Sequence, residues 1–283
     1  MAHGKSTLSK LIAGLLKPKS GRITVDNINT ANKKEFYNLR KKIGMVFQNP
    51  ENQIIFNNVY DDIAFALKNL ELDNEEIRIK TSLEKLRMDK YLKSPTYELS
   101  LGQKQRVTIA GVLAVNPKYI IFDEPTTMLD SEGKEDVYEI VKTLKKQGYT
   151  IIYVTNVMDE ILIADRVVVL EKGEIIKEFN KEEILENIEF LEEHEIKIPS
   201  LAKMLYEFKK NGIEIKLEEW TKEYFSDPEN QKKAEKACAV TVASAAPATP
   251  IWKTQINTAF PAIFKQFATT EIRRGVAESP CAR

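Results

Sequence analysis

Cysteine and histidine are scarce in this sequence, and their scarcity excludes two kinds of architecture. The only cysteines are Cys238 and Cys281, both near the C-terminus, so a disulfide framework is excluded and a reducing compartment is indicated. Histidine occurs only as His3 and His194, and neither has a cysteine beside it. The sequence therefore offers no His/Cys cluster for a zinc centre.

An excess of charge of one sign and a long apolar run are also lacking. The 42 Lys and Arg residues balance the 42 Asp and Glu residues, whereas nucleic-acid-binding proteins usually carry a basic surplus. No uninterrupted apolar stretch is long enough to cross a bilayer, and no apolar signal region precedes the first helical pattern. We therefore expect a cytosolic protein that does not bind nucleic acid and that reaches a membrane only through partners.

Short β-branched runs alternate with longer amphipathic segments over residues 1–179. This alternation predicts an α/β domain with a parallel sheet. Buried strands are expected at Ile120–Phe122, Thr150–Thr155 and Arg166–Leu170. Helices are expected at Asn58–Leu70, Gly102–Val115 and Glu132–Gln147.

Two further zones follow this domain. Residues 180–227 form a charged amphipathic region, in which Lys181–His194 and Ser200–Asn211 carry apolar residues at helical spacing. Residues 228–283 have weak periodicity and few acids. We expect a small helical appendage followed by a disordered or foreign tail, with a partner-binding tail as the alternative.

Gly4, Lys5, Ser6 and Thr7 open an apolar-faced helix, as the second half of a phosphate-binding loop does. Backbone N–H groups at such a helix start point at phosphates, and the helix dipole favours their negative charge. Lys5 would reach the β- and γ-phosphates, and Ser6 would bind Mg²⁺. An ordinary helix with a chance Gly-Lys-Ser sequence is the alternative.

Two acids, Asp123 and Glu124, end the apolar run that begins at Tyr119. The carboxyl ends of parallel strands form the ligand-binding edge of an open α/β sheet. There Asp123 can hold Mg²⁺, and Glu124 can polarise an attacking water as a general base. An exposed acidic pair before a proline turn is the alternative interpretation.

The stretch Leu99–Arg106 reads Leu-Ser-Leu-Gly-Gln-Lys-Gln-Arg, close to the Leu-Ser-Gly-Gly-Gln signature of ABC ATPases. The sequence as a whole resembles the ATP-binding subunits of ABC transporters. The order of the matching features along the chain is that of the family: Lys5, Gln48, the signature, Asp123-Glu124 and Leu129-Asp130. The resemblance implies a P-loop NTPase fold of the ABC type with a helical signature subdomain and a small C-terminal helical appendage.

Further segments narrow the resemblance to the energy-coupling-factor and cobalt-transport ATPases. Val46–Gln53 resembles their Q-loop, Tyr60–Phe65 follows as it does there, and Met158–Glu160 is also similar. The resemblance covers residues 4 to about 226. It implies uptake of a metal ion or vitamin, with the transported substrate selected by another subunit.

The resemblance also assigns roles to residues. Gln48 would contact Mg²⁺ or the attacking water, and Asp130 would lie at a dimer interface. The helix start with Ser100, Gly102 and Gln103 would bind the γ-phosphate of ATP held by a second ABC ATPase subunit. The implied cofactors are ATP and Mg²⁺. The implied partners are that second subunit, a transmembrane coupling protein and a substrate-binding membrane subunit, which together would hold the chain at the cytoplasmic face of the membrane.

Four departures from the family pattern bear on activity. The resemblance implies opening strands, an adenine-stacking aromatic and a first half of the phosphate loop that are missing before Gly4. Leu101 replaces the first signature glycine and adds bulk beside the ligand. Asn156 stands where the family has its switch histidine, and asparagine can donate a hydrogen bond but carries no charge. The tail after residue 228 has no family counterpart.

These departures leave several functions open. The first is a transport ATPase in which Glu124, Gln48 and Asn156 act in catalysis. The second is an impaired ATP-binding scaffold subunit of a heterodimer, and the third is a non-functional gene fragment. A soluble ABC protein of DNA repair or translation is disfavoured, because long insertions and tandem cassettes are not visible.

Overall fold

The computed structural model describes residues 4–180, 183–194, 196, 206 and 210. The chain divides into two units, Met1–Pro199 and Ser200–Arg283, and every element named below belongs to the first. The expected helix at Ser200–Asn211, apart from Tyr206 and Lys210, and the expected tail lie outside the described residues. No helix in the described part has both the length and the apolarity needed to span a membrane.

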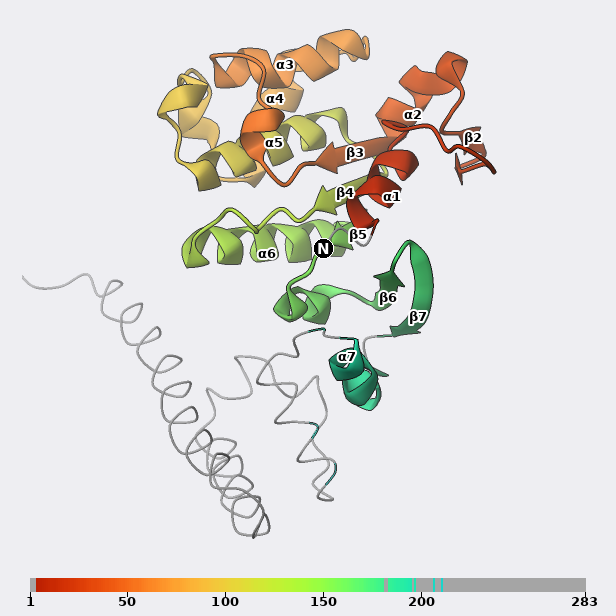
Figure 1. The fold of residues 1–283 in the computed structure, drawn as a ribbon. Coiled ribbons are helices and arrows are strands. Elements are labelled where there is room, and N and C mark those ends of the chain that lie inside the picture. Colours follow the sequence, from red (N-terminus) through yellow and green to blue (C-terminus); the bar gives the residue numbers. More distant parts are fainter. Residues whose placement is uncertain (1–3, 181–182, 195, 197–205, 207–209, 211–283) are drawn as a thin grey trace, which may run out of the picture. The chain divides into compact units, whose positions relative to one another are not determined.

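A three-stranded parallel sheet organises the domain. Strands β3 (Ile43–Val46), β4 (Tyr119–Asp123) and β5 (Thr150–Val154) lie in the order β3-β4-β5, as Figure 1 shows. In register, Met45 pairs with Ile121 and Ile121 with Ile152. The parallel sheet expected from the sequence is confirmed. Its strands are short apolar runs separated by helices, the pattern typical of buried parallel strands.

The two faces of this sheet are covered by different elements. Ile120 and Phe122 point into a cluster shared with α5 (Leu101–Val115) and α6 (Ser131–Lys146). Ile121 points to the opposite face and packs with Ala13, which follows α1 (Lys5–Ile12). This alternation is the period of two of a strand buried on both sides.

Helix boundaries follow the capping residues. Asn58, Ser100 and Asp130 each accept a backbone N–H at the start of α3 (Val59–Asn69), α5 and α6. An oxygen at the N-cap satisfies one of the free N–H groups of the first turn. The three expected helices therefore begin within a residue or so of the observed ones. Helix α4 (Glu75–Lys85), which packs on α5, was not expected from the sequence.

A small antiparallel hairpin precedes the sheet and was not expected. Strands β1 (Thr24–Val25) and β2 (Ile28–Asn29) are joined by Asp26 and Asn27, which both have positive φ. Two such residues form the turn that matches the twist of a hairpin. Helix α2 (Phe36–Lys42) follows and leads directly into β3.

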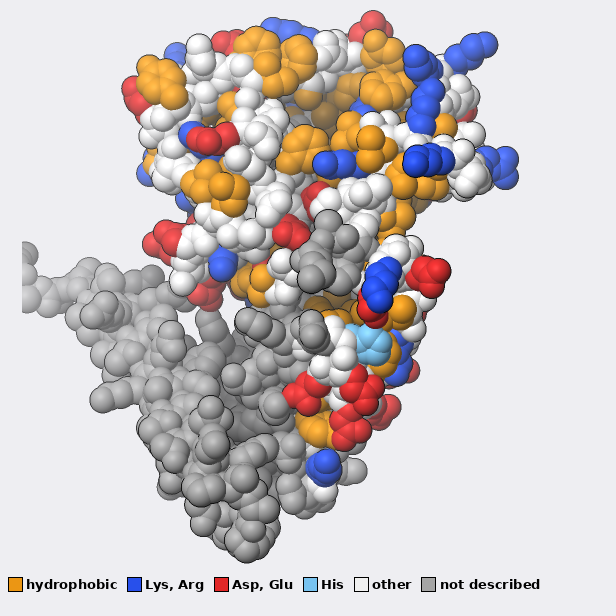
Figure 2. Space-filling model, viewed as in Figure 1, with side chains coloured by type: hydrophobic (Ala, Val, Ile, Leu, Met, Phe, Trp, Pro, Cys, Tyr) orange, Lys and Arg blue, Asp and Glu red, His pale blue; other side chains and the backbone are white. Residues whose placement is uncertain are grey.

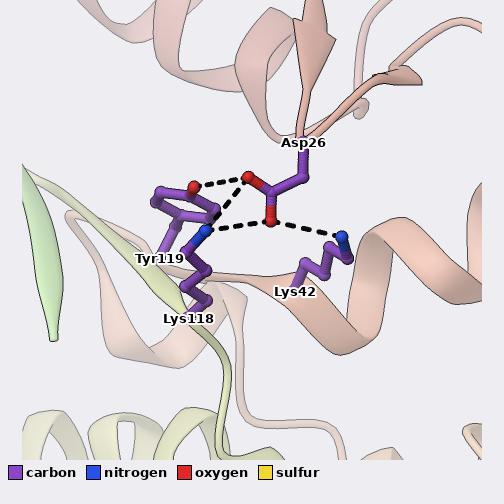
Figure 3. A network of polar contacts seen from close by, with 4 residues as sticks. All are labelled: Asp26, Lys42, Lys118 and Tyr119. Carbon is purple, nitrogen blue, oxygen red and sulfur yellow. Dashed lines mark hydrogen bonds and ion pairs between the residues drawn. The ribbon is translucent and has the colours of Figure 1, made fainter.

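Asp26 ties this hairpin to the sheet, as Figure 3 shows. Its carboxylate accepts hydrogen bonds from Tyr119 at 2.7 Å, Lys118 at 3.1 Å and Lys42 at 3.2 Å. The hydrogen bond from Tyr119, followed by those from Lys118 and Lys42, lowers the pKa of Asp26 to about 2. The network joins β1–β2, α2 and the start of β4 at the end of the sheet opposite to Asp123.

A second hairpin and a short helix follow β5. Strands β6 (Arg166–Glu171) and β7 (Glu174–Asn180) pair antiparallel, and Leu191 of α7 (Ile188–Glu193) is buried against them with Phe179. The helix expected over Lys181–His194 is shorter in the structure. A 3₁₀ turn, Leu185–Asn187, precedes α7, and the Asn187 amide in it donates to the carbonyl of Glu183.

Charge is unevenly distributed over the surface although the net charge is zero. Figure 2 shows basic side chains gathered on the side that carries α2 and β2, and acidic side chains gathered over α7. The basic residues on and next to α2 are Lys33, Lys34, Arg40, Lys41 and Lys42.

Candidate functional site

The first turn of α1 presents backbone N–H groups at the carboxyl edge of the sheet. Gly4 is the residue before the helix and has φ 86°, a conformation that a side chain would strain. The N–H groups in the first turn of a helix have no acceptor within it. Lys5 and Ser6, which are half-buried, and the exposed Thr7 form this turn. The local geometry is therefore that of an anion-binding helix start.

Ser6 and Asp123 meet although they are far apart in sequence. The Ser6 hydroxyl donates to Asp123 Oδ1 over 2.9 Å. Asp123 is 5% exposed and is the last residue of β4, so its carboxylate is held by a buried strand. The structure thus brings these two sequence-predicted side chains together.

Gln48 and Glu124 form a second contact at the same edge. Gln48 follows β3, and its Nε2 donates to Glu124 Oε2 over 3.3 Å. The Thr127 hydroxyl also reaches Glu124 Oε2, at 3.4 Å. Carboxylate and amide side chains from the ends of neighbouring strands are thus brought to one place.

The backbone of Glu124 is held in an unusual conformation. Its φ is 50°, in the left-handed region that costs a non-glycine residue roughly 1 kcal/mol. Its N–H donates to the carbonyl of Val154 at the end of β5, at 2.9 Å. Strained backbone at a sheet edge is common where a side chain must be aimed at a ligand.

A cavity of about 330 Å³ opens beside these residues. Of its lining residues, Ser6, Gln48 and Asp123 were predicted as site residues from the sequence. The others had no predicted role at the site: Phe47, Asn49 and Asn52 lie within the segment Val46–Gln53, and Lys10 lies one turn after Ser6 on α1.

The loop after β3 is fixed by its own side chains and by α5. Gln53 accepts the Phe47 N–H at 3.0 Å and donates to the Met45 carbonyl at 3.1 Å. Lys104 of α5 pairs with Glu51 at 2.6 Å. The loop that carries Gln48 is therefore linked directly to the helix that begins within the Leu-Ser-Leu-Gly-Gln sequence.

The start of α5 is a complete capping box. The Gln103 N–H donates to the Ser100 hydroxyl at 3.3 Å, and the Gln103 side chain accepts the Ser100 N–H at 2.9 Å. A side chain at Gly102 would lie 4.0 Å from Gly133 Cα, so this helix start adjoins α6. Leu101 is half-buried against the core, so much of its bulk is accommodated by packing.

Two candidate residues remain to be placed, Asp130 and Asn156. Asp130 accepts the Gly133 N–H at 2.8 Å as the N-cap of α6. Asn156 is exposed and follows β5 by two residues. The sequence-predicted residues thus form one group around Ser6, Asp123 and Glu124. A second group lies around Ser100 and Asp130, and none of its members is among the described residues that line the cavity.

Comparison with known proteins agrees with this geometry. The ABC transporter family model matches residues 2–127. The energy-coupling factor transporter ATP-binding protein EcfA1 of Clostridium perfringens is 41% identical over 218 residues, covering 76% of this chain and 78% of the relative.

Two solved structures have the same fold. One is cbiO1 of Clostridium perfringens, part of the ABC transporter complex cbiONQ, with a TM-score of 0.60 and 36% identity over 71% of this chain and 82% of that one. The other is the dimeric ATP-binding cassette MJ0796 bound to ADP and Pi, with a TM-score of 0.57 and 32% identity over 63% of this chain and 81% of that one. The chain therefore belongs to the ABC transporter ATPase family, within the group of energy-coupling-factor ATP-binding proteins.

Proposed function

We propose that this chain binds and hydrolyses Mg²⁺-ATP to energise uptake of a metal ion or a vitamin through an energy-coupling-factor transporter. The observation that carries the proposal is the contact between the Ser6 hydroxyl and the buried Asp123 carboxylate at a helix start. Hydroxyl and carboxylate oxygens are ligands that Mg²⁺ prefers, and free N–H groups beside them suit phosphates. The residues present therefore fit a magnesium-bound nucleotide.

In this proposal each group at the edge has a distinct task. Lys5 and the first turn of α1 hold the phosphates, and Ser6 and Asp123 hold the metal ion. When bound, Mg²⁺ neutralises the charge that develops on the transferred phosphoryl group. Glu124 and Gln48, which contact each other at 3.3 Å, orient the attacking water. Asn156 donates a hydrogen bond towards the γ-phosphate from the exposed loop after β5.

The second group of residues supports a composite site between two subunits. Ser100, Gly102 and Gln103 start α5 at a place that does not line the cavity beside Ser6. A second ABC ATPase subunit would bring its own helix start to the nucleotide, with Asp130 near the contact. The dimeric cassette to which this chain is similar in fold favours this arrangement.

An exposed apolar surface supports a contact with the transmembrane coupling protein. Ile55, Phe56 and Phe65 are exposed, and the rings of Phe56 and Phe65 lie 5.3 Å apart. Asp62 anchors this loop by accepting the N–H groups of Ile55 and Phe56 at 2.7 and 3.1 Å. The surface continues from the Gln48 loop, so a partner bound there would sense the nucleotide and would hold the chain at the cytoplasmic face of the membrane.

An impaired scaffold subunit remains the second candidate, and Asn156 favours it. The amide of Asn156 supplies no positive charge to the phosphates. In that case a partner subunit would turn over ATP while this chain only binds it.

Magnesium-dependent ATP turnover by the purified chain, alone and with a partner ATPase subunit, distinguishes the two candidates. We expect turnover that requires Mg²⁺ and falls by about 10²-fold or more in Asp123→Asn, because the metal loses a ligand held by β4. The exposed Asp73→Asn variant is the matched control and should keep full turnover. Turnover that is unaffected by Asp123→Asn in the mixed dimer would contradict hydrolysis at this chain's site.

A further inference from the structure

Four polar side chains meet in the core directly beneath the turn that follows Glu124. Thr126 comes from that turn, Tyr138 from α6, Tyr153 from β5 and Glu160 from the 3₁₀ segment Met158–Ile163. Thr126 and Glu160 are 1% and 2% exposed. A carboxyl group this deeply buried is costly to place in a core and indicates a specific task.

The Glu160 carboxyl group is the acceptor at the centre of this cluster. Its Oε1 accepts a short hydrogen bond from the Thr126 hydroxyl and a second one from the Tyr138 hydroxyl at 3.0 Å. Its Oε2 and the Tyr153 hydroxyl are buried without a hydrogen-bond partner within the described part of the chain. Burial, and then the charge of Glu160, raises the pKa of Tyr153, so its hydroxyl stays neutral.

Through Thr126 the cluster reaches the backbone of Glu124. The Thr127 N–H donates to the Glu124 carbonyl at 3.3 Å, and the Leu129 N–H donates to the Thr126 carbonyl at 3.0 Å. These bonds form two overlapping turns, over residues 124–127 and 126–129. Fixing the Thr126 side chain therefore helps to hold Glu124 at its φ of 50°, which an unconstrained glutamate would leave.

At its other end the cluster reaches the loop that carries Asn156. The Glu160 N–H donates to the Val157 carbonyl at 3.2 Å, and the Val157 N–H donates to the Thr155 hydroxyl at 2.8 Å. Asn156 lies between Thr155 and Val157. Glu160 is thus connected through its carboxyl group to the turn after β4 and through its backbone N–H to the loop after β5.

We propose that Glu160 is a positioning residue for ATP hydrolysis, which holds the Glu124 turn through the Thr126 hydroxyl and aligns it with the Asn156 loop. Glu160 does not line the cavity beside Ser6, so it acts on nucleotide chemistry only through these loops. The inference rests on the proposed function for its kinetic consequence. The positioning itself is a property of the chain without nucleotide.

The kinetic test compares Thr126→Val with Thr126→Ser. Valine keeps the volume of threonine and removes the hydroxyl, whereas serine keeps the hydroxyl. We expect Thr126→Val to lower kcat by about 10- to 100-fold with KM for ATP changed less than about twofold, because a misplaced Glu124 affects the reaction more than binding. Thr126→Ser should restore most of the rate.

The control is Thr108→Val, which removes another buried threonine hydroxyl. Thr108 is 3% exposed, and its hydroxyl donates to the Gln105 carbonyl of its own helix. It should leave kcat within about twofold of the unchanged chain. A rise in KM without a fall in kcat, or equal losses in Thr126→Val and Thr108→Val, would overturn the inference.

A double-mutant cycle with Glu160→Leu tests whether the two residues act as one unit. Because Thr126 and Glu160 share one hydrogen bond, Thr126→Val should lower kcat little further once Glu160→Leu is present. If the two losses of kcat multiplied in the double variant, the inference would be overturned. Glu160→Gln keeps an acceptor oxygen and should retain more activity than Glu160→Leu.

Amide hydrogen exchange separates failure of this inference from failure of the proposed function. The Glu124 and Thr127 amides should exchange faster in Thr126→Val and Glu160→Leu than in Thr126→Ser, without any nucleotide. If the unchanged chain shows no turnover, the proposed function fails and exchange alone decides. Equal exchange of these amides in all variants would then overturn the positioning.

Discussion

At the scale of single residues, the candidate site depends on side chains aimed by strained or buried backbone. Glu124 sits at a φ of 50° beside a proline, with its N–H bonded to Val154. Asp123 is buried at the end of β4. The orientation of these side chains cannot be derived from residue identity, because it depends on which distant segments supply the hydrogen bonds.

Asn156 yields a prediction at this scale. Under the proposed function, its replacement by histidine would introduce a group that can carry positive charge near the transferred phosphoryl group, and loss of such stabilisation typically costs about 10²–10³ in rate. We expect Asn156→His to raise kcat at least about tenfold, measured as steady-state phosphate release.

Asn69→His, at the exposed end of α3, is the control for a histidine added elsewhere and should leave kcat unchanged. If Asn156→His had the rate of the unchanged chain, Asn156 would not face the reacting phosphate.

At the scale of elements, the sequence predicted many of the helices and strands that the structure contains. Asn58, Ser100 and Asp130 mark helix starts because their side chains accept N–H groups of the first turn. The β1–β2 hairpin was missed because its strands have two residues each, too short for any periodicity. Its available signal was the Asp26-Asn27 pair, both of which adopt positive φ.

The Asp26 network gives a prediction for how stability depends on pH. The hydrogen bond from Tyr119 and the neighbouring lysines lower the pKa of Asp26 from 3.8 to about 2. Because the folded-state pKa is depressed, the stabilisation is complete above pH 3.8 and is lost as the pH falls towards about 2. Asp26→Asn should therefore be less stable than the unchanged chain at pH 6, and this difference should shrink below about pH 4.

Urea unfolding followed by circular dichroism between pH 6 and pH 3 measures this difference. The exposed Asp73→Asn variant controls for the loss of one carboxylate on the surface. A stability difference that stayed constant over this pH range would show that the ionised form of Asp26 contributes nothing specific.

At the scale of the whole molecule, the sequence could predict the fold class but only part of the assembly of the site. Alternating strands and helices predicted the parallel sheet, and the order of motifs predicted that Ser6 would meet Asp123. The contacts of Lys104 with Glu51 and of Thr126 with Glu160 could not be predicted, because each joins segments far apart in sequence through common surface or core residues. The family resemblance predicted that the Ser100 helix start would act on the nucleotide of a second subunit, and in the fold Ser100 does not line the cavity beside Ser6.

The function proposed for this chain depends above all on hydrolysis of magnesium-bound ATP by the group around Ser6, Asp123 and Glu124. Single-turnover hydrolysis of radiolabelled ATP by the chain and by Glu124→Gln, with nucleotide binding measured in parallel, tests it most directly. We predict that Glu124→Gln binds Mg²⁺-ATP as tightly as the unchanged chain and hydrolyses it at least about 10²-fold more slowly. Equal rates of hydrolysis in the two proteins, or no binding of Mg²⁺-ATP to either, would contradict the claim.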